Sequence, residues 1–169
     1  MPDHREFLRS VELLGTLLPA ELDQFSEALI STEFQPGQLI LEEGQPNRAL
    51  HLVREGRIRV TRKVDERELI LCDLSAGRTF GELSILDEGT ASATLRAVPR
   101  TVILSLSSGD LHKLLEDSPA TAAKFWRALA LDLRRRLLHT NDVVRTYFEV
   151  NRALIENPTF REAYAMVSQ

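Results

Sequence analysis

Residues 49–75 read ALHLVREGRIRVTRKVDERELILCDLS, and this stretch indicates the fold. It holds three short runs rich in β-branched residues, ALHLVRE, RIRVTRKV and RELILCDL, separated by turn residues such as Gly56 and Asp65. Apolar residues recur at every second position, which is the period of a β-strand rather than that of a helix. The stretch therefore predicts three consecutive strands joined by turns.

The same period of two extends in both directions, between Phe34 and Leu106. QLILEE precedes the quoted stretch, and SATLRAV and TVILSL follow it. Six such runs in about seventy residues have the spacing of a small barrel or jelly roll. We therefore expect a mainly β fold with flanking helices, whose core is a jelly-roll barrel of about eight strands.

Helical patterns lie on both sides of this β block. Residues 1–31 carry apolar residues at helical spacing: Leu13, Leu14, Leu17 and Leu18, then Leu22, Phe25, Leu29 and Ile30. From SSGDLHKLLED onward the pattern is helical again, with Ser107 or Ser108 as the expected cap. The predicted organisation is an N-terminal helical segment (1–31), the β-barrel with a following short helix (32–118), a long helix (119–148) and a short helical tail (149–169).

The long helix carries one apolar stripe. Residues three and four apart form it: Trp126, Leu129, Leu133, Leu137, Thr140, Val144 and Tyr147. A stripe of this period suits pairing with a second helix in a coiled coil. A helix of some thirty residues is also longer than the flank of a small barrel. We therefore expect a homodimer through residues 119–148; the alternative is that the stripe packs on the chain's own barrel.

Composition bounds the function further. The chain has 169 residues, 43% hydrophobic and 27% charged, which suits one globular domain. A net charge of −4 gives no general reason to bind nucleic acid or an anionic membrane. The N-terminus does not resemble a signal peptide, and no run reaches the roughly eighteen apolar residues of a membrane span. We expect a cytoplasmic protein in which the single Cys72 is a small buried hydrophobe.

An ordered set of glycine and apolar positions resembles the cyclic-nucleotide-binding domain family, the module of catabolite activator protein and of cyclic-AMP-dependent protein kinase regulatory subunits. The resemblance covers roughly residues 17–147 and ends its framework with FGEL at Phe80–Leu83. The positions that carry it are Phe34, Gly37, Ile40, Gly44, Leu50, Leu52, Gly56, Ile58, Val60, Gly77 and Phe80–Leu83. It implies a double-stranded β-helix (jelly-roll) barrel and a regulatory module.

The family's ligand site is a phosphate-binding cassette that resembles FGEL followed by Pro-Arg-Ser-Ala-Thr. The resemblance implies that backbone N–H groups at the start of a short helix and the arginine bind the cyclic phosphate. It also implies that Glu82 accepts a hydrogen bond from the ribose 2′-hydroxyl. The ligand-binding positions that it implies here are Phe80, Gly81, Glu82, Leu83, Ser84, Ala91, Ser92 and Ala93.

The Pro-Arg pair of the cassette is missing, because Thr90 and Ala91 stand in its place. A hydrogen bond to a charged group contributes about 1.5–3 kcal/mol, which is roughly a ten- to hundredfold difference in affinity. We therefore expect weakened binding of cyclic AMP or cyclic GMP. Arg96, Arg100 and Arg48 are the nearby cations that could compensate.

On the long helix, RRRLLHTNDVV resembles the region where catabolite activator protein presents a Thr-Ser pair to the purine. Thr140 and Asn141 stand in those places, and both side chains could hydrogen-bond to a base edge. The alternative for Thr140 is that it only tunes helix pairing.

Other function classes find less support. A metal-dependent oxygenase on a small barrel needs two or three converging histidines, whereas His4, His51, His112 and His139 are widely spaced. A helix-turn-helix after the long helix would need some sixty further residues, and the arginines at 134–136 spread around a helix. We expect no enzyme activity, no metal and no direct nucleic-acid or membrane partner.

The resemblance implies a non-catalytic regulatory module that senses a small ligand, with cyclic AMP or cyclic GMP as first candidates and no other cofactor. An effector protein, not identifiable from the sequence, would respond to it. The alternative is an interaction or dimerisation scaffold that has lost nucleotide binding.

Overall fold

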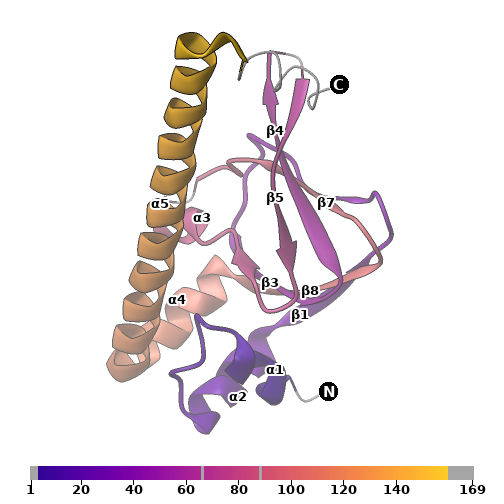
Figure 1. Cartoon of the computed structure of the whole chain (residues 1–169). Coiled ribbons are helices and arrows are strands. Elements are labelled where there is room, and N and C mark those ends of the chain that lie inside the picture. Colours follow the sequence, from indigo (N-terminus) through magenta and orange to yellow (C-terminus); the bar gives the residue numbers. More distant parts are fainter. Residues whose placement is uncertain (1–3, 66, 88, 160–169) are drawn as a thin grey trace. The chain divides into compact units, whose positions relative to one another are not determined.

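A computed structural model describes residues 4–65, 67–87 and 89–159 (Figure 1). The chain divides into two compact units, Met1–Leu129 and Ala130–Gln169. The first unit contains both sheets, the helices at the N-terminus and the start of the last helix. The described part of the second unit, residues 130–159, consists mainly of the continuation of that helix, which ends at Glu156.

Two four-stranded antiparallel sheets form the barrel (Figure 1). One sheet has the order β1-β8-β3-β6 and the other the order β2-β7-β4-β5. This confirms the predicted mainly β, jelly-roll fold. The strands are β1 (Ile30–Phe34), β2 (Leu39–Leu41), β3 (Ala49–Glu55), β4 (Arg57–Val64), β5 (Arg67–Ser75), β6 (Thr79–Phe80), β7 (Thr94–Ala97) and β8 (Thr101–Ser107).

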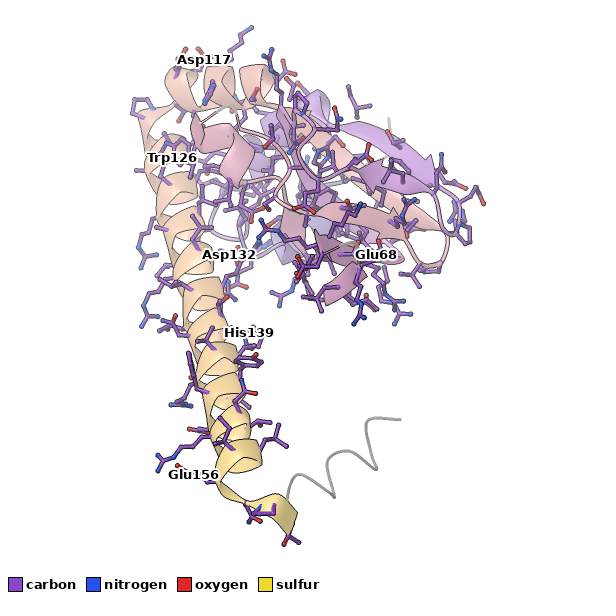
Figure 2. All side chains as sticks on the ribbon, turned by 90° about the horizontal axis from the view of Figure 1, so that it is seen from above. Glu68, Asp117, Trp126, Asp132, His139 and Glu156 are labelled. Carbon is purple, nitrogen blue, oxygen red and sulfur yellow. The ribbon has the colours of Figure 1, made fainter. Side chains whose placement is uncertain are left out.

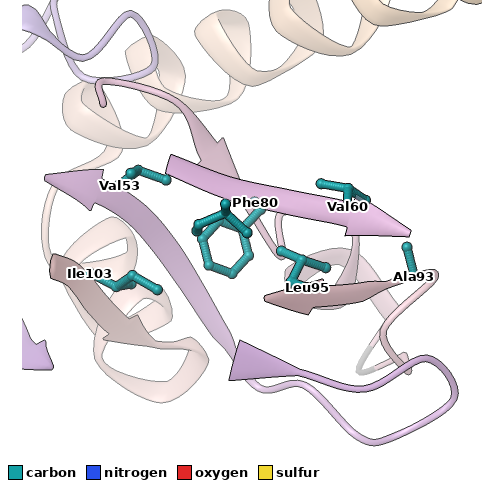
Figure 3. Packing of buried hydrophobic residues seen from close by; sticks show 7 residues of the cluster. Val53, Val60, Phe80, Ala93, Leu95 and Ile103 are labelled. Carbon is teal, nitrogen blue, oxygen red and sulfur yellow. The ribbon is translucent and has the colours of Figure 1, made fainter. Parts of the chain in front are cut away.

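The core between the sheets is built by alternation along the strands (Figure 3). On β4, Ile58 and Val60 are buried, whereas Arg57 and Arg59, which alternate with them, are not. Both sheets contribute to one cluster: Val53, Ile58, Val60, Phe80, Ala93, Leu95 and Ile103. Burying one such large side chain contributes about 1.5–3 kcal/mol. Phe80 and Ala93, which bound the predicted cassette, therefore anchor it to the core.

The N-terminal segment is less helical than predicted. Helix α1 (Arg5–Ser10) is followed by turns, and α2 (Pro19–Ala28) ends before Leu29. Ile30, which we had expected in the helix, begins β1 and pairs with Ser105 of β8. Pairing with β8 and the β-branched residues Ile30 and Thr32 favour a strand here over a further helical turn.

Cys72 is exposed, so the prediction that it is buried was wrong. The reason is its strand: β5 lies at the edge of its sheet, and every residue of it except Leu74 is exposed. The apolar run from Leu69 to Leu71 is exposed with it. Hydrophobicity alone did not distinguish an edge strand from a core strand.

Helix α4 (Ser108–Asp117) follows β8 directly, with Ser107 as its cap. Ser107 Oγ accepts a hydrogen bond from the Asp110 N–H at 3.0 Å, as a capping serine does. This confirms Ser107 as one of the two predicted caps.

The last helix, α5 (Pro119–Glu156), starts at the predicted proline but runs eight residues beyond the predicted end at 148. Trp126, Asp132, His139 and Glu156 follow one another along it (Figure 2). Residues 149–156, expected in a separate tail, continue the helix because no glycine or proline interrupts it before Pro158. The remainder of the predicted tail, from residue 160, lies outside the described residues.

The start of α5 is attached to α2 within the first unit. Phe125 is fully buried and its ring stacks on that of Phe25, with centroids 6.2 Å apart. Lys124 Nζ lies 2.8 Å from a carboxylate oxygen of Glu21, and Thr121 donates a hydrogen bond to the same group at 2.7 Å. Burial opposes ionisation of Glu21, but these hydrogen bonds lower its pKa. Within the described residues, no helix combines the length and apolarity that a membrane crossing requires.

Candidate ligand-binding cassette

The predicted cassette connects β6 to β7. After Phe80 come Gly81 and Glu82, then the short helix α3 (Leu83–Asp87), and the segment returns to β7 through residues 90–93. Phe80 pairs with His51 of β3, and Ala93 is buried in the core cluster. Both ends of the cassette are thus attached to the barrel. The side chain of Ser84 lies outside what the structure describes.

Gly81 has a structural requirement of its own. Its φ is +80°, in the left-handed region that favours glycine. A Cβ atom there would lie 2.5 Å from Asn47 Nδ2 and 2.6 Å from the Ala49 carbonyl oxygen. The resemblance implied that Gly81 belongs to the ligand site. The structure shows that tight packing and backbone conformation already require a glycine here.

Glu82 is only 5% exposed, which is rare for a carboxylate. Its carbonyl accepts a hydrogen bond from the Ile85 N–H at 3.3 Å, which starts the turn of α3. Ile85 is buried and holds α3 to the barrel, whereas Leu83 is half exposed. The arrangement fixes an acidic side chain at the beginning of a short helix.

The far end of the cassette is tied to the loop before β3. The Ala91 N–H donates to the Gln45 carbonyl at 2.8 Å, and the Gly44 N–H donates to the Ala91 carbonyl at 2.8 Å. Thr90 forms an isolated bridge with Pro46. Ala91 is 8% exposed, whereas its neighbour Ser92 is exposed. These bonds fix the backbone of Ala91 in this loop. That Ala91 stands where the family has its arginine stays a prediction from the sequence.

The nearby cations are placed differently from one another. Arg96 is exposed on β7 between the buried Leu95 and Ala97, so it faces away from the core. Arg100 binds Glu33 at 2.6 Å and Glu55 at 3.4 Å, and its hydrogen bond with Glu33 raises its pKa. Arg48 is exposed, and across the described ranges its side chain makes no hydrogen bond or ion pair. Of the three candidates, Arg48 alone follows the loop of residues 44–47 that bonds to the cassette and has a side chain without a hydrogen bond or ion pair among the described residues.

Three polar side chains, Asn47, His51 and Ser105, are linked by hydrogen bonds next to the start of the cassette. His51 Nδ1 is 2.8 Å from Ser105 Oγ, and His51 Nε2 is 3.1 Å from Asn47 Oδ1. The His51 ring stacks on Phe80 with centroids 4.7 Å apart. Burial lowers the pKa of His51 from 6.5 to about 4, so the ring is neutral near neutral pH. No sequence motif indicated that Asn47, His51 and Ser105 would come together. The one available signal was the position of His51 between Leu50 and Leu52, which are both buried.

The remaining predicted positions belong to the second unit. Thr140 and Asn141 are exposed on α5, and the Thr140 hydroxyl donates to the Arg136 carbonyl at 2.9 Å. That bond is usual for a threonine inside a helix. Contact of these two residues with a base stays a prediction. Over the part of the chain that the structure describes, no three His, Cys, Asp or Glu side chains are grouped as a metal site would require.

Comparison with known proteins identifies relatives of this chain. Residues 31–118 match the family model described as the cyclic nucleotide-binding domain. A cyclic AMP receptor protein of Thermus thermophilus is 31% identical over 161 residues, which are 95% of this chain and 70% of that protein. A cGMP-dependent protein kinase of Eimeria tenella is 33% identical over 113 residues, 67% of this chain but 11% of the kinase.

Among solved structures, the N-terminal domain of a transcriptional regulator from Streptomyces coelicolor is similar with a TM-score of 0.69 at 30% identity. That match covers 82% of this chain and 94% of the other. The chain spans less than two thirds of the length of several of the relatives that it resembles.

Proposed function

We propose, from the premise that the chain belongs to the cyclic nucleotide-binding domain family, that it is a non-catalytic regulatory module sensing a small ligand. Cyclic AMP and cyclic GMP are the first candidates. The observation that carries the proposal is the junction of β6 and α3. There a left-handed Gly81 leads into the buried Glu82, with both flanks of the cassette attached to the core.

In the proposed site each position has a role drawn from the family. Glu82 would accept from a ribose hydroxyl, and backbone N–H groups at the start of α3 would face the phosphate. At Ala91 no guanidinium neutralises that phosphate, and the Glu82 carboxylate lies in the same cassette. The loss of one charge-assisted bond predicts an affinity roughly ten- to a hundredfold below that of a complete cassette.

Ala91 also favours a second candidate function, in which the barrel is an interaction scaffold that no longer binds a nucleotide. The fold does not depend on the missing arginine, because the backbone of Ala91 is held by Gly44 and Gln45. The two candidates therefore share a structure and differ in ligand binding.

The response to a ligand would be a shift between two conformations of the helices. We propose that α5 joins two chains into a homodimer and that an effector protein senses the change. Support comes from apolar side chains on α5 that are exposed in the single chain, among them Leu137, Val144, Tyr147 and Phe148. Such residues on a helix commonly mark a partner surface. A cytoplasmic location, without a nucleic-acid or membrane partner, completes the proposal.

Calorimetric titration of the full chain with cyclic AMP and cyclic GMP tests the proposed function. We expect one-site binding weaker than about 100 μM, and its loss in Glu82→Ala, which removes the acceptor for the ribose hydroxyl. Heat and thermal shift that stay unchanged at millimolar ligand would instead support the scaffold, because any ligand of the folded state stabilises it.

A further inference from the structure

Three polar side chains behind the cassette form a chain of hydrogen bonds with one consistent direction. Asn47 Oδ1 can only accept, so His51 Nε2 carries the proton that it donates over 3.1 Å. With one ring proton, His51 Nδ1 must accept, and Ser105 Oγ donates to it over 2.8 Å. Asn47 Nδ2 in turn donates to the Ala49 carbonyl at 3.0 Å. The network assigns both the histidine tautomer and the orientation of the Asn47 amide.

This network, Asn47 with His51 and Ser105, is held by the barrel. Ser105 lies on β8 and His51 on β3, and the two residues are partners in the strand register. Asn47 is only 4% exposed, in the loop that leads into β3. Burial holds the His51 ring neutral near neutral pH, which agrees with the single ring proton that the bonds require.

Asn47 contacts both ends of the segment that carries Glu82. At the beginning, its amide fills the space beside Gly81, where a Cβ would lie 2.5 Å from Nδ2. At the end, its backbone N–H donates to the Gly89 carbonyl at 3.4 Å. The next residue, Arg48, accepts at its carbonyl from the Ser108 N–H at 2.8 Å, where α4 begins. One loop therefore meets the cassette and the start of a helix.

We propose that Asn47 is a positioning residue for the cassette: its side-chain amide, oriented by His51 and Ser105, packs against Gly81 and holds the start of the cassette against β3, while its backbone N–H holds the Gly89 end. The residue does not need to touch a ligand for this role. Its effect on cyclic-nucleotide affinity rests on the proposed function, whereas its effect on the segment itself can be measured without any ligand.

The competing explanation is that Asn47 contributes only to overall stability. Thr101 provides a matched control for this, because it is another fully buried polar residue whose side chain bonds to backbone. Its hydroxyl donates to the Arg57 carbonyl at 3.1 Å and accepts from the Arg57 N–H at 3.3 Å. Thr101 lies on β8 four residues before Ser105, about 13 Å away at roughly 3.3 Å per residue.

The experiment is hydrogen exchange of the ligand-free full chain in three forms: unchanged, Asn47→Ala and Thr101→Ala. We expect Asn47→Ala to accelerate exchange in the peptides spanning residues 80–92 by about tenfold or more relative to those of β8. Thr101→Ala should change residues 80–92 no more than the rest of the barrel. Equal effects of the two variants on residues 80–92, or unchanged exchange there in Asn47→Ala, would overturn the proposal.

Asn47→Asp serves as a second variant if Asn47→Ala does not fold. It keeps the size of the side chain and an acceptor for His51, and it removes the donor to the Ala49 carbonyl. The same acceleration within residues 80–92 is expected, and its absence contradicts the proposal. Titration of each variant with cyclic AMP measures nucleotide affinity independently of the exchange experiment. If the unchanged chain binds no nucleotide, the proposed function fails, while the exchange data still decide the role of Asn47.

Discussion

Asn47 Nδ2 occupies the space that a Cβ atom at residue 81 would need, so Gly81 and Asn47 are packed in direct contact. Because the φ of Gly81 is also +80°, two independent reasons exclude a larger residue there. This contact places the start of the cassette on the loop before β3, and it determines the first prediction.

Gly81→Ala should destabilise the fold more than Gly77→Ala does. Gly77 has a similar φ of +84°, but a Cβ there would meet no atom within 4 Å. Both variants incur about 1–2 kcal/mol for the left-handed backbone, and the crowding at Gly81 should add about 1–3 kcal/mol. Denaturant unfolding of the two variants measures the difference. Equal losses of stability would mean that Asn47 moves aside freely.

Ala91→Arg should raise the affinity for cyclic AMP at least about tenfold, because it supplies the missing charge-assisted bonds. The backbone hydrogen bonds of Ala91 do not involve its side chain and should persist. Thr90→Arg is the matched control, since it adds the same charge one residue earlier on an exposed side chain. Calorimetry compares the two. A gain of the same size in Thr90→Arg would show a general charge effect instead of a rebuilt site.

Stability should fall in mild acid because of His51. Burial lowers its pKa from 6.5 in the unfolded chain to about 4 in the folded one, so between these values only the unfolded state takes up the proton. The contribution of the neutral His51 ring to the free energy of unfolding is complete above pH 6.5, and it is lost as the pH falls toward 4. The difference of about 2.5 between these two pKa values corresponds to about 3 kcal/mol.

Chemical unfolding between pH 7 and pH 4.5 measures this dependence. The non-titrating variant His51→Gln should show a shallower decline over the same range. Parallel curves for the two proteins would mean that His51 is protonated in the folded state as readily as in the unfolded chain.

Val144→Glu should convert the proposed dimer to a monomer, because it places a charge in the apolar stripe of α5. Val143→Glu is the control, since residue 143 is 55% exposed and lies about 100° around the helix from residue 144. Sedimentation equilibrium of the full chain gives the masses. A monomeric unchanged chain, or equal dissociation in both variants, would contradict pairing through this stripe.

The strands of the barrel core were predictable because their signal is local. Ile58 and Val60 alternate with arginines, and the turn glycine Gly56 follows β3 directly. The junction of Gly81 and Glu82 was visible for the same reason, since the two residues are adjacent in the chain; their role in a ligand site stays a prediction. Cys72 was misplaced because exposure depends on whether a strand has neighbours on both sides, which an apolar run does not show.

The sequence by itself thus determined the period of the strands and the positions of the turns, which are properties of neighbouring residues. Only the tertiary structure brought Asn47, His51 and Ser105 together, and it decided that Ile30 begins a strand. The physical reason is strand register: pairing of β3 with β8 sets His51 opposite Ser105, 54 residues further along the chain, and no local pattern encodes such a partner.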